Sequence, residues 1–291
     1  PPFGSSNDGN FPPAIEIYRE AQALDSAGSY AKAKEKYFLA KDLDCIRFRA
    51  SEDINGAIRE LSQKYGAYHV PMVEVFEVES PQGIIGDNLL TEHVHPNVDG
   101  FFLMADAFYN TITMSETIGA LDSTYYQPSW YYRKRWGFTS LDSLFAQLRL
   151  QQLMGGWPFK PDTLINRFIY DYVPKNVLDS SAFMALYYTD FPLEAAHRRM
   201  AGYYKVRNQP FKAAMEYNAI TKIDPWGLKN FIEAGNLFLT ADAYDFALEV
   251  FLASLRITRE KYVLFRIGEI YSRMGEHEQA LNYLHEVYAL D

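Results

Sequence analysis

A repeated spacing in the last third of the chain constrains its fold more than any other feature. Three alanines lie first 34 and then 33 residues apart: Ala213, Ala247 and Ala280. Each is followed four residues later by a large side chain, and Gly235 and Gly268 keep the 33-residue interval in the preceding segments. Two helices approach closely only where small residues leave room, and large side chains then fill the neighbouring spaces. The spacing therefore predicts successive helical hairpins in residues 192–291.

This unit resembles the tetratricopeptide repeat, a helix–turn–helix module of about 34 residues. The resemblance covers residues 192–291 and implies three antiparallel helical pairs stacked in a right-handed α-solenoid. It also implies that Ala213, Ala247 and Ala280 are almost fully buried, and that a concave groove binds a protein or peptide partner. The alternative is an ordinary helical bundle in which the periodicity arose by chance.

A similar hairpin is predicted within residues 1–45. An amphipathic stretch at residues 14–27 precedes a second one that carries residues typical of the same repeat positions: Gly28, Tyr30, Ala33, Tyr37 and Ala40. A solitary repeat cannot bury its own apolar face. We therefore expect this hairpin to pack on the segment that follows it.

The sequence pattern of residues 46–115 predicts a small α/β region. A helix is expected at Ser51–Tyr65 with Gly66 at its end. The β-branched run Val70–Val78 predicts a strand, and Pro71 confines its start to an edge or an entry. A glycine-containing loop at Ser80–Leu90 leads to an apolar helix at Val98–Ile112.

Residues 116–191 are expected to form a helical linker or degenerate repeats. The pattern predicts helices at Leu141–Met154, with Thr139 or Ser140 as N-cap, and at Asp162–Tyr172. A turn is predicted at Trp157–Pro161, because both prolines in this run resist helix formation.

Composition excludes several classes of function. The net charge of −9 argues against a nucleic-acid partner, since phosphate binding requires a basic surface. The basic run Arg133–Arg135 is expected to be a solvated face. Cys45 is the only cysteine, which excludes an intramolecular disulfide and a cysteine-based zinc site. No apolar run reaches the roughly 18 residues of a membrane span, and no cofactor is expected. The chain begins without methionine, so we expect it to be part of a longer protein.

Residues 91–100 concentrate polar chemistry in the sequence T-E-H-V-H-P-N-V-D-G. Glu92 and His95 are three residues apart, so a tight turn brings the carboxylate beside the imidazole. Such a carboxylate orients the ring through one nitrogen and leaves the other available as a base. Pro96 suits the first turn of the next helix, and Gly100 allows that helix to pack closely.

This block, with the preceding G-I-I-G-D-N-L-L-T, resembles the last block of the SGNH (GDSL-type) hydrolases. The likeness runs from about Arg47 to Ile112 and implies a serine esterase or acyl hydrolase with His95 as base and Glu92 as supporting acid. Two features depart from that family. The acid is glutamate instead of aspartate, and the Gly-Asp-Ser nucleophile block is not found in this sequence.

The resulting prediction is a mainly α protein with tetratricopeptide-like repeats and a small α/β remnant of an SGNH hydrolase domain. The chain is expected to be the C-terminal piece of such an esterase and to be inactive alone. An ester substrate is expected only for the full-length protein. The alternative is a non-enzymatic scaffold that binds a protein or peptide.

Other polar residues admit different interpretations. His93 and His95 alternate, and a shared metal is an alternative that lacks a third ligand. For Arg47 and Arg49, ordinary salt bridges are favoured over contact with an anionic substrate. The remaining histidines are expected to be structural or surface residues: His69, His197, His277 and His285.

Overall fold

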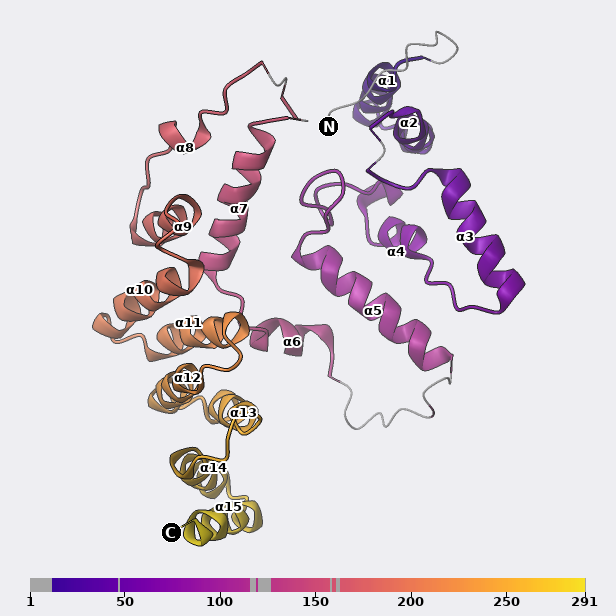
Figure 1. Cartoon of the computed structure of the whole chain (residues 1–291). Coiled ribbons are helices and arrows are strands. Elements are labelled where there is room, and N and C mark those ends of the chain that lie inside the picture. The colour runs from indigo at the N-terminus through magenta and orange to yellow at the C-terminus, as the bar shows by residue number, and fades with distance from the viewer. Residues whose placement is uncertain are drawn as a thin grey trace. The chain divides into compact units, whose positions relative to one another are not determined.

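The computed structural model describes residues 12–46, 48–115, 119, 127–157, 159–160 and 163–290 (Figure 1). These residues are mainly helical, as predicted. They contain fifteen α-helices, one short 3-10 helix and no strand. The chain divides into two compact units, Pro1–Ser129 and Trp130–Asp291, which are described separately.

The described part of unit 1 consists of a hairpin followed by three further α-helices and a short 3-10 helix. Its helices are α1 (Ala14–Ser26), α2 (Tyr30–Leu43), α3 (Glu52–Tyr65), α4 (Met72–Val78), η1 (Pro81–Gly83) and α5 (Val98–Met114). As predicted, α3 ends at Gly66 in a left-handed conformation, with φ of 65°. Its apolar residues Ile54, Ile58 and Leu61 are exposed. The α1–α2 hairpin contacts the segment that follows it through ion pairs, Lys34 with Glu77 of α4 and Lys41 with Glu52 of α3.

The predicted strand at residues 70–78 is wrong, since Met72–Val78 forms a helix, and so is the predicted α/β character of this region for the described residues. The segment M-V-E-V-F-E-V forms α4, which buries Phe76 and packs against α5. A strand must bond its backbone to a neighbouring strand, whereas a helix satisfies most of its backbone internally. No partner strand is present among the described residues, so the helix prevails over the β-branched composition.

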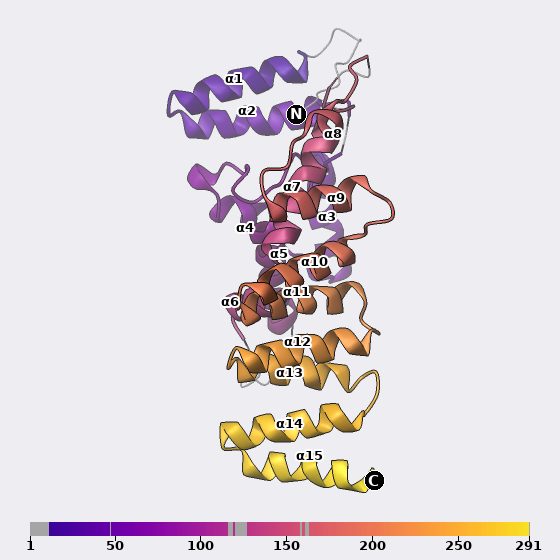
Figure 2. The ribbon, with the colours of Figure 1, turned by 90° about the vertical axis from the view of Figure 1, so that its left-hand side faces the viewer.

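Unit 2 is a succession of helices. Its helices are α6 (Ser129–Arg135), α7 (Ser140–Met154), α8 (Phe168–Asp171), α9 (Val177–Tyr187), α10 (Leu193–Val206), α11 (Pro210–Ile223), α12 (Leu228–Thr240), α13 (Tyr244–Ser254), α14 (Lys261–Met274) and α15 (His277–Ala289). Helix α7 packs mainly on α9 and α6 meets α13, whereas from α9 to α15 consecutive helices are in contact. Figure 2 shows α10–α15 as three antiparallel pairs lying one after another.

Packing in these pairs follows the small residues. Ala213, Ala247 and Ala280 are buried as predicted. A Cβ placed at Gly235 would lie 2.5 Å from the ring of Phe251, and one at Gly268 would lie 2.9 Å from Leu284. The small residue of one helix thus receives the large residue of its partner.

The turns inside the hairpins are also equivalent. Asn208, Asp242 and Gly275 all adopt positive φ, at 53°, 53° and 81°. In each turn the next amide donates to a carbonyl five residues earlier, at 2.9–3.0 Å. This bond closes the first helix of each pair and redirects the chain into the second.

The α1–α2 hairpin uses the same turn. Gly28 has φ of 75°, and the Ser29 amide donates to the Leu24 carbonyl at 2.8 Å. Ala33 lies five residues after Gly28, as Ala213 lies five after Asn208. Both alanines are buried, so the hairpin of unit 1 and those of unit 2 share one local design.

The segment before the hairpins of unit 2 agrees only in part with the sequence prediction. Helix α7 begins at the predicted place, where Thr139 and Asp142 form a capping box. The second helix was predicted at Asp162–Tyr172, but α8 covers only Phe168–Asp171. Asn166 explains the late start, because its side-chain oxygen accepts the Phe168 amide at 3.1 Å. Pro158, Pro161 and Asp162 lie outside the described residues.

Arg135 shows that the predicted solvated basic face is wrong at one position. Its side chain is 13% exposed and pairs with Asp245 and with Glu249, the latter at 3.1 Å. The guanidinium also lies 4.0 Å from the ring centroid of Tyr131 and 4.5 Å from that of Phe246. Arg135 therefore joins α6 to α13 within unit 2.

Candidate functional site

The predicted acid–histidine motif occupies a short loop between η1 and α5. Leu90 and Pro96 form an isolated antiparallel bridge that closes the loop, and the Thr91 amide donates to the His95 carbonyl at 2.8 Å. Asn97 then caps α5 by accepting the Gly100 amide at 3.0 Å. A side chain at Gly100 would collide with the Leu89 carbonyl oxygen, so the predicted close packing of this helix is confirmed.

The Glu92 carboxylate turns inward and organises this loop. One oxygen accepts the His95 amide at 2.8 Å and contacts the Nδ1 of the His95 ring, while the other accepts the Val94 amide at 3.2 Å. Burial of this side chain, which is only 4% exposed, opposes ionisation. The bonds from His95 and the charges of both histidines outweigh that effect and hold the pKa of Glu92 below its ordinary value.

His95 has the geometry expected of an oriented imidazole. Its Nδ1 faces Glu92, so the carboxylate and the ring lie on the same side of the turn. The ring is 72% exposed, and within the described chain Glu92 is its only side-chain partner. No serine, threonine or cysteine in that part of the chain bonds to it. The structure thus brings the two predicted residues together, and no nucleophile among the described residues hydrogen-bonds to the ring.

His93 takes a different direction from His95. Its Nδ1 lies 2.6 Å from the second oxygen of Glu92, and its ring packs edge-on against Phe48 with centroids 5.2 Å apart. Burial lowers the pKa of His93 more than the nearby Glu92 carboxylate raises it, and the charge of Arg49 adds to the lowering. No group of three or more His, Cys, Asp or Glu residues that could hold a metal occurs in the described part of the chain.

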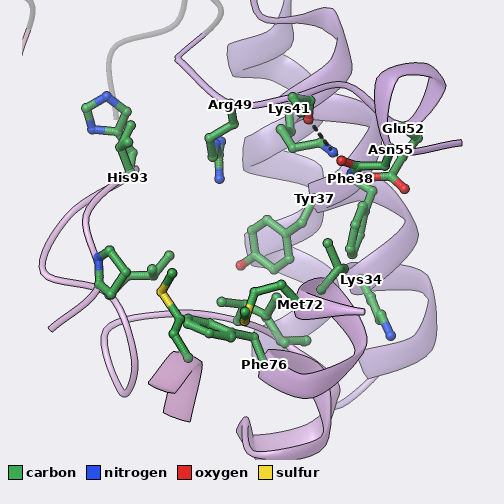
Figure 3. Close-up of a pocket in the computed structure, with 18 residues that line it drawn as sticks. Lys34, Tyr37, Phe38, Lys41, Arg49, Glu52, Asn55, Met72, Phe76 and His93 are labelled. Atoms are coloured by element: carbon green, nitrogen blue, oxygen red, sulfur yellow. Dashed lines mark hydrogen bonds and ion pairs between the residues drawn. The ribbon is translucent and has the colours of Figure 1, made fainter. Parts of the chain in front are cut away.

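His93 lines a cavity of about 460 Å³ in unit 1, and His95 does not (Figure 3). The wall is largely apolar, with contributions from Met72, Val73, Phe76, Ile84, Ile85 and Leu90. In the close-up, Arg49 extends from the chain between His93 and Lys41 toward Tyr37. Sequence analysis did not predict this cavity, because its wall combines residues from α2, α3, α4, the loop and α5.

Among the described residues, Arg49 has no partner for the salt bridge that sequence analysis favoured. It donates no hydrogen bond to a described residue, and no carboxylate among them lies in ion-pair range. The apolar surroundings lower the pKa of its guanidinium, and the charges of Asp44 and Glu92 oppose this. Arg47, the other arginine of that prediction, lies outside the described residues.

A second histidine cluster lies in unit 2 and was missed by sequence analysis. His197 of α10 is fully buried, and its Nδ1 lies 2.6 Å from a Glu216 oxygen of α11. Its Nε2 lies 3.2 Å from an Asp142 oxygen of α7, and the other Asp142 oxygen accepts the Thr139 amide and hydroxyl. No motif could have revealed this cluster, because its members come from separate helices.

The two acidic residues hold a proton on the buried His197. Burial by itself would lower the pKa of His197, but hydrogen bonds to Asp142 and Glu216 and their charges raise it to about 9. Burial raises the pKa of Glu216, although its hydrogen bond to His197 and the charge of His197 act to lower it. Burial also acts to raise the pKa of Asp142, but its bonds to His197 and Thr139 bring it below the ordinary value. These contacts join α7 to the α10–α11 hairpin.

No family model and no curated protein matches this chain. Within the described residues, no helix is long and apolar enough to span a bilayer.

Proposed function

We propose that the chain is a scaffold that binds a protein or peptide partner on a tetratricopeptide-like solenoid formed by α10–α15. The observation that carries this proposal is the equivalence of the three hairpins. Their small residues, large residues and left-handed turns recur in register. Stacked repeats of this kind present an extended surface made by the first helices of successive hairpins.

The binding surface that fits this proposal lies on α12 and α14. Tyr262 and Phe265 are three residues apart on one side of α14 and are both exposed. The Tyr262 hydroxyl donates to Asn236 of α12 at 2.9 Å, so this side of α14 borders α12. Exposed aromatic side chains beside an amide are suited to a peptide that carries apolar side chains.

Selection from a displayed peptide library, followed by titration of the purified peptide, tests the scaffold. Phe265→Ala is expected to reduce the affinity for the selected peptide by about tenfold or more, as is usual for a central aromatic contact. Leu281→Ala is the matched control, because Leu281 is also exposed and apolar but lies on α15, the second helix of the same hairpin. Equal affinity of the two variants, or loss only in the control, would contradict the proposal.

A second candidate function rests on the contact between Glu92 and His95. We propose that residues 47–112 are the last block of an SGNH-type hydrolase domain, in which His95 acts as base and Glu92 orients it. The carboxylate–Nδ1 contact and the exposed ring support this role. Helix α4 replaces the strand expected from the resemblance and speaks against it.

The coding sequence immediately upstream of Pro1 separates the two candidates. A Gly-Asp-Ser turn after an apolar segment would supply the serine that attacks an ester, and a fluorophosphonate probe would label that serine in the full-length protein. A coding sequence without such a serine would leave the scaffold as the function and His95 as a surface residue.

A further inference from the structure

The cavity of unit 1 has the size and lining of a small-molecule site. Its volume of about 460 Å³ lies within the range of 300–1,000 Å³ that is typical of ligand pockets. Met72, Val73 and Phe76 form one part of the wall, and Ile84 and Ile85 form another. The tail of a ligand in contact with these side chains would be removed from water, which favours an aliphatic group.

The charged groups of the lining are not equivalent. Lys34 is paired with Glu77 at 2.8 Å, and Lys41 is held by Glu52 and by the Ala50 carbonyl at 3.1 Å. The Tyr37 hydroxyl bonds to Asp25 at 3.2 Å. Arg49 alone among the described cations of this lining has neither a hydrogen bond nor an ion pair. Arg49 is exposed to solvent, and the carboxylates of Asp44 and Glu92 act on it only through their charge, so its guanidinium is available to hydrogen-bond an anionic ligand.

We propose that this cavity binds a carboxylate that carries an aliphatic tail of medium length, with Arg49 holding the carboxylate and the apolar wall holding the tail. The guanidinium fork matches a carboxylate with two parallel hydrogen bonds. One available cation balances one negative charge, which favours a monoanionic head over a doubly charged phosphate. The chain as a whole carries a net charge of −9, which does not attract anions. Binding of this ligand therefore depends on the local charge of Arg49 and on the apolar wall.

The cavity lies partly within the segment of the hydrolase proposal, but it does not involve the proposed base or the proposed peptide surface. His95 does not line the cavity, and the exposed aromatic residues of α14 belong to the other unit. Failure of the hydrolase or scaffold proposals would therefore leave the cavity proposal standing, and its failure would not affect them.

Calorimetric titration of the whole chain with octanoate tests the proposal. Acetate tests the head without the tail, octylammonium tests the tail with the opposite charge, and octyl phosphate tests the charge of the head. Octanoate is expected to bind at least about tenfold more tightly than any of the other three. Equal binding of octanoate and octylammonium would overturn the role of Arg49, and equal binding of octanoate and acetate would overturn the role of the wall. Tighter binding of octyl phosphate would reassign the site to a phosphate head.

Variants give an independent test. Arg49→Gln is expected to reduce the affinity for octanoate by about tenfold or more, because a charge-assisted pair is lost. Arg59→Gln is the matched control: Arg59 is an arginine of unit 1 that lies near Glu74 and does not line the cavity. The affinity of the Arg59→Gln variant for octanoate is expected to differ from that of the parent chain by less than about twofold. Val73→Phe should fill the cavity and reduce binding. Unchanged affinity in Arg49→Gln, with circular dichroism matching the parent chain, would refute the proposal.

Discussion

The two units each pair a histidine with carboxylates, and the two arrangements differ in burial and in chain connectivity. In unit 1, Glu92 and His95 are three residues apart on one turn, and the His95 ring is open to solvent. In unit 2, His197 meets Glu216 and Asp142 across three helices and is sealed from solvent. The first arrangement costs little to break and leaves a nitrogen available for chemistry. The second leaves no nitrogen available and contributes to stability.

The largest expected effect is the loss of His197. In His197→Ala the buried carboxylate of Glu216 loses its cationic partner, and breaking a buried pair in this way costs about 3–5 kcal/mol. Urea unfolding followed by tryptophan fluorescence measures this, since all four tryptophans belong to unit 2. A loss below about 1 kcal/mol would show that the cluster does not stabilise the unit.

The pH dependence of unit 2 provides the next effect. His197 binds its proton more tightly in the folded chain, with a pKa of about 9 compared with 6.5. Its contribution is therefore complete below about pH 6.5 and is lost as the pH rises toward 9, at up to about 1.4 kcal/mol per pH unit. The raised pKa of Glu216 also makes the stability of unit 2 fall as the pH rises. This fall begins at lower pH, above the ordinary pKa of 4.5.

Tryptophan-detected unfolding at several pH values between 6 and 9 measures this slope. In His197→Gln the slope over this interval should largely disappear. A parent chain whose stability is constant or rises across the interval would contradict the assignment of a protonated His197.

A smaller effect is expected at the residue that positions Asp142. Thr139 caps α7 and donates its hydroxyl to Asp142 at 2.9 Å. Thr139→Ala removes this cap and is expected to destabilise unit 2 by about 1 kcal/mol. Thr139→Ser retains the hydroxyl and is the matched control. Equal stability of the alanine and serine variants would show that the capping box does not support the buried cluster.

The smallest effect is expected at His95. Its ring is exposed, so His95→Ala should change the free energy of unfolding by less than about 0.5 kcal/mol, measured by far-UV circular dichroism. Hydrolysis of p-nitrophenyl acetate by this chain should remain at background, because no nucleophile bonds to the ring in the described residues. Saturable turnover that vanishes in His95→Ala would show that a nucleophile lies beside His95 after all.

Sequence alone determined the local features of this protein. The positions of α10–α15, the burial of Ala247 and the contact between Glu92 and His95 all depend on residues close in the chain or repeated at a fixed interval. Helix geometry and a tight turn are enough to bring such residues together, so their spacing predicts the result.

Only the tertiary structure decided the rest. His197 and Asp142 are 55 residues apart, and Arg135 meets Asp245 across 110. Residues 72–78 have the composition of a strand but form a helix, since no neighbouring strand is present in the described chain to accept their backbone bonds. Arg49 faces an apolar cavity whose wall comes from several elements. Contacts of this kind depend on how distant segments pack together, and a single sequence does not record that packing.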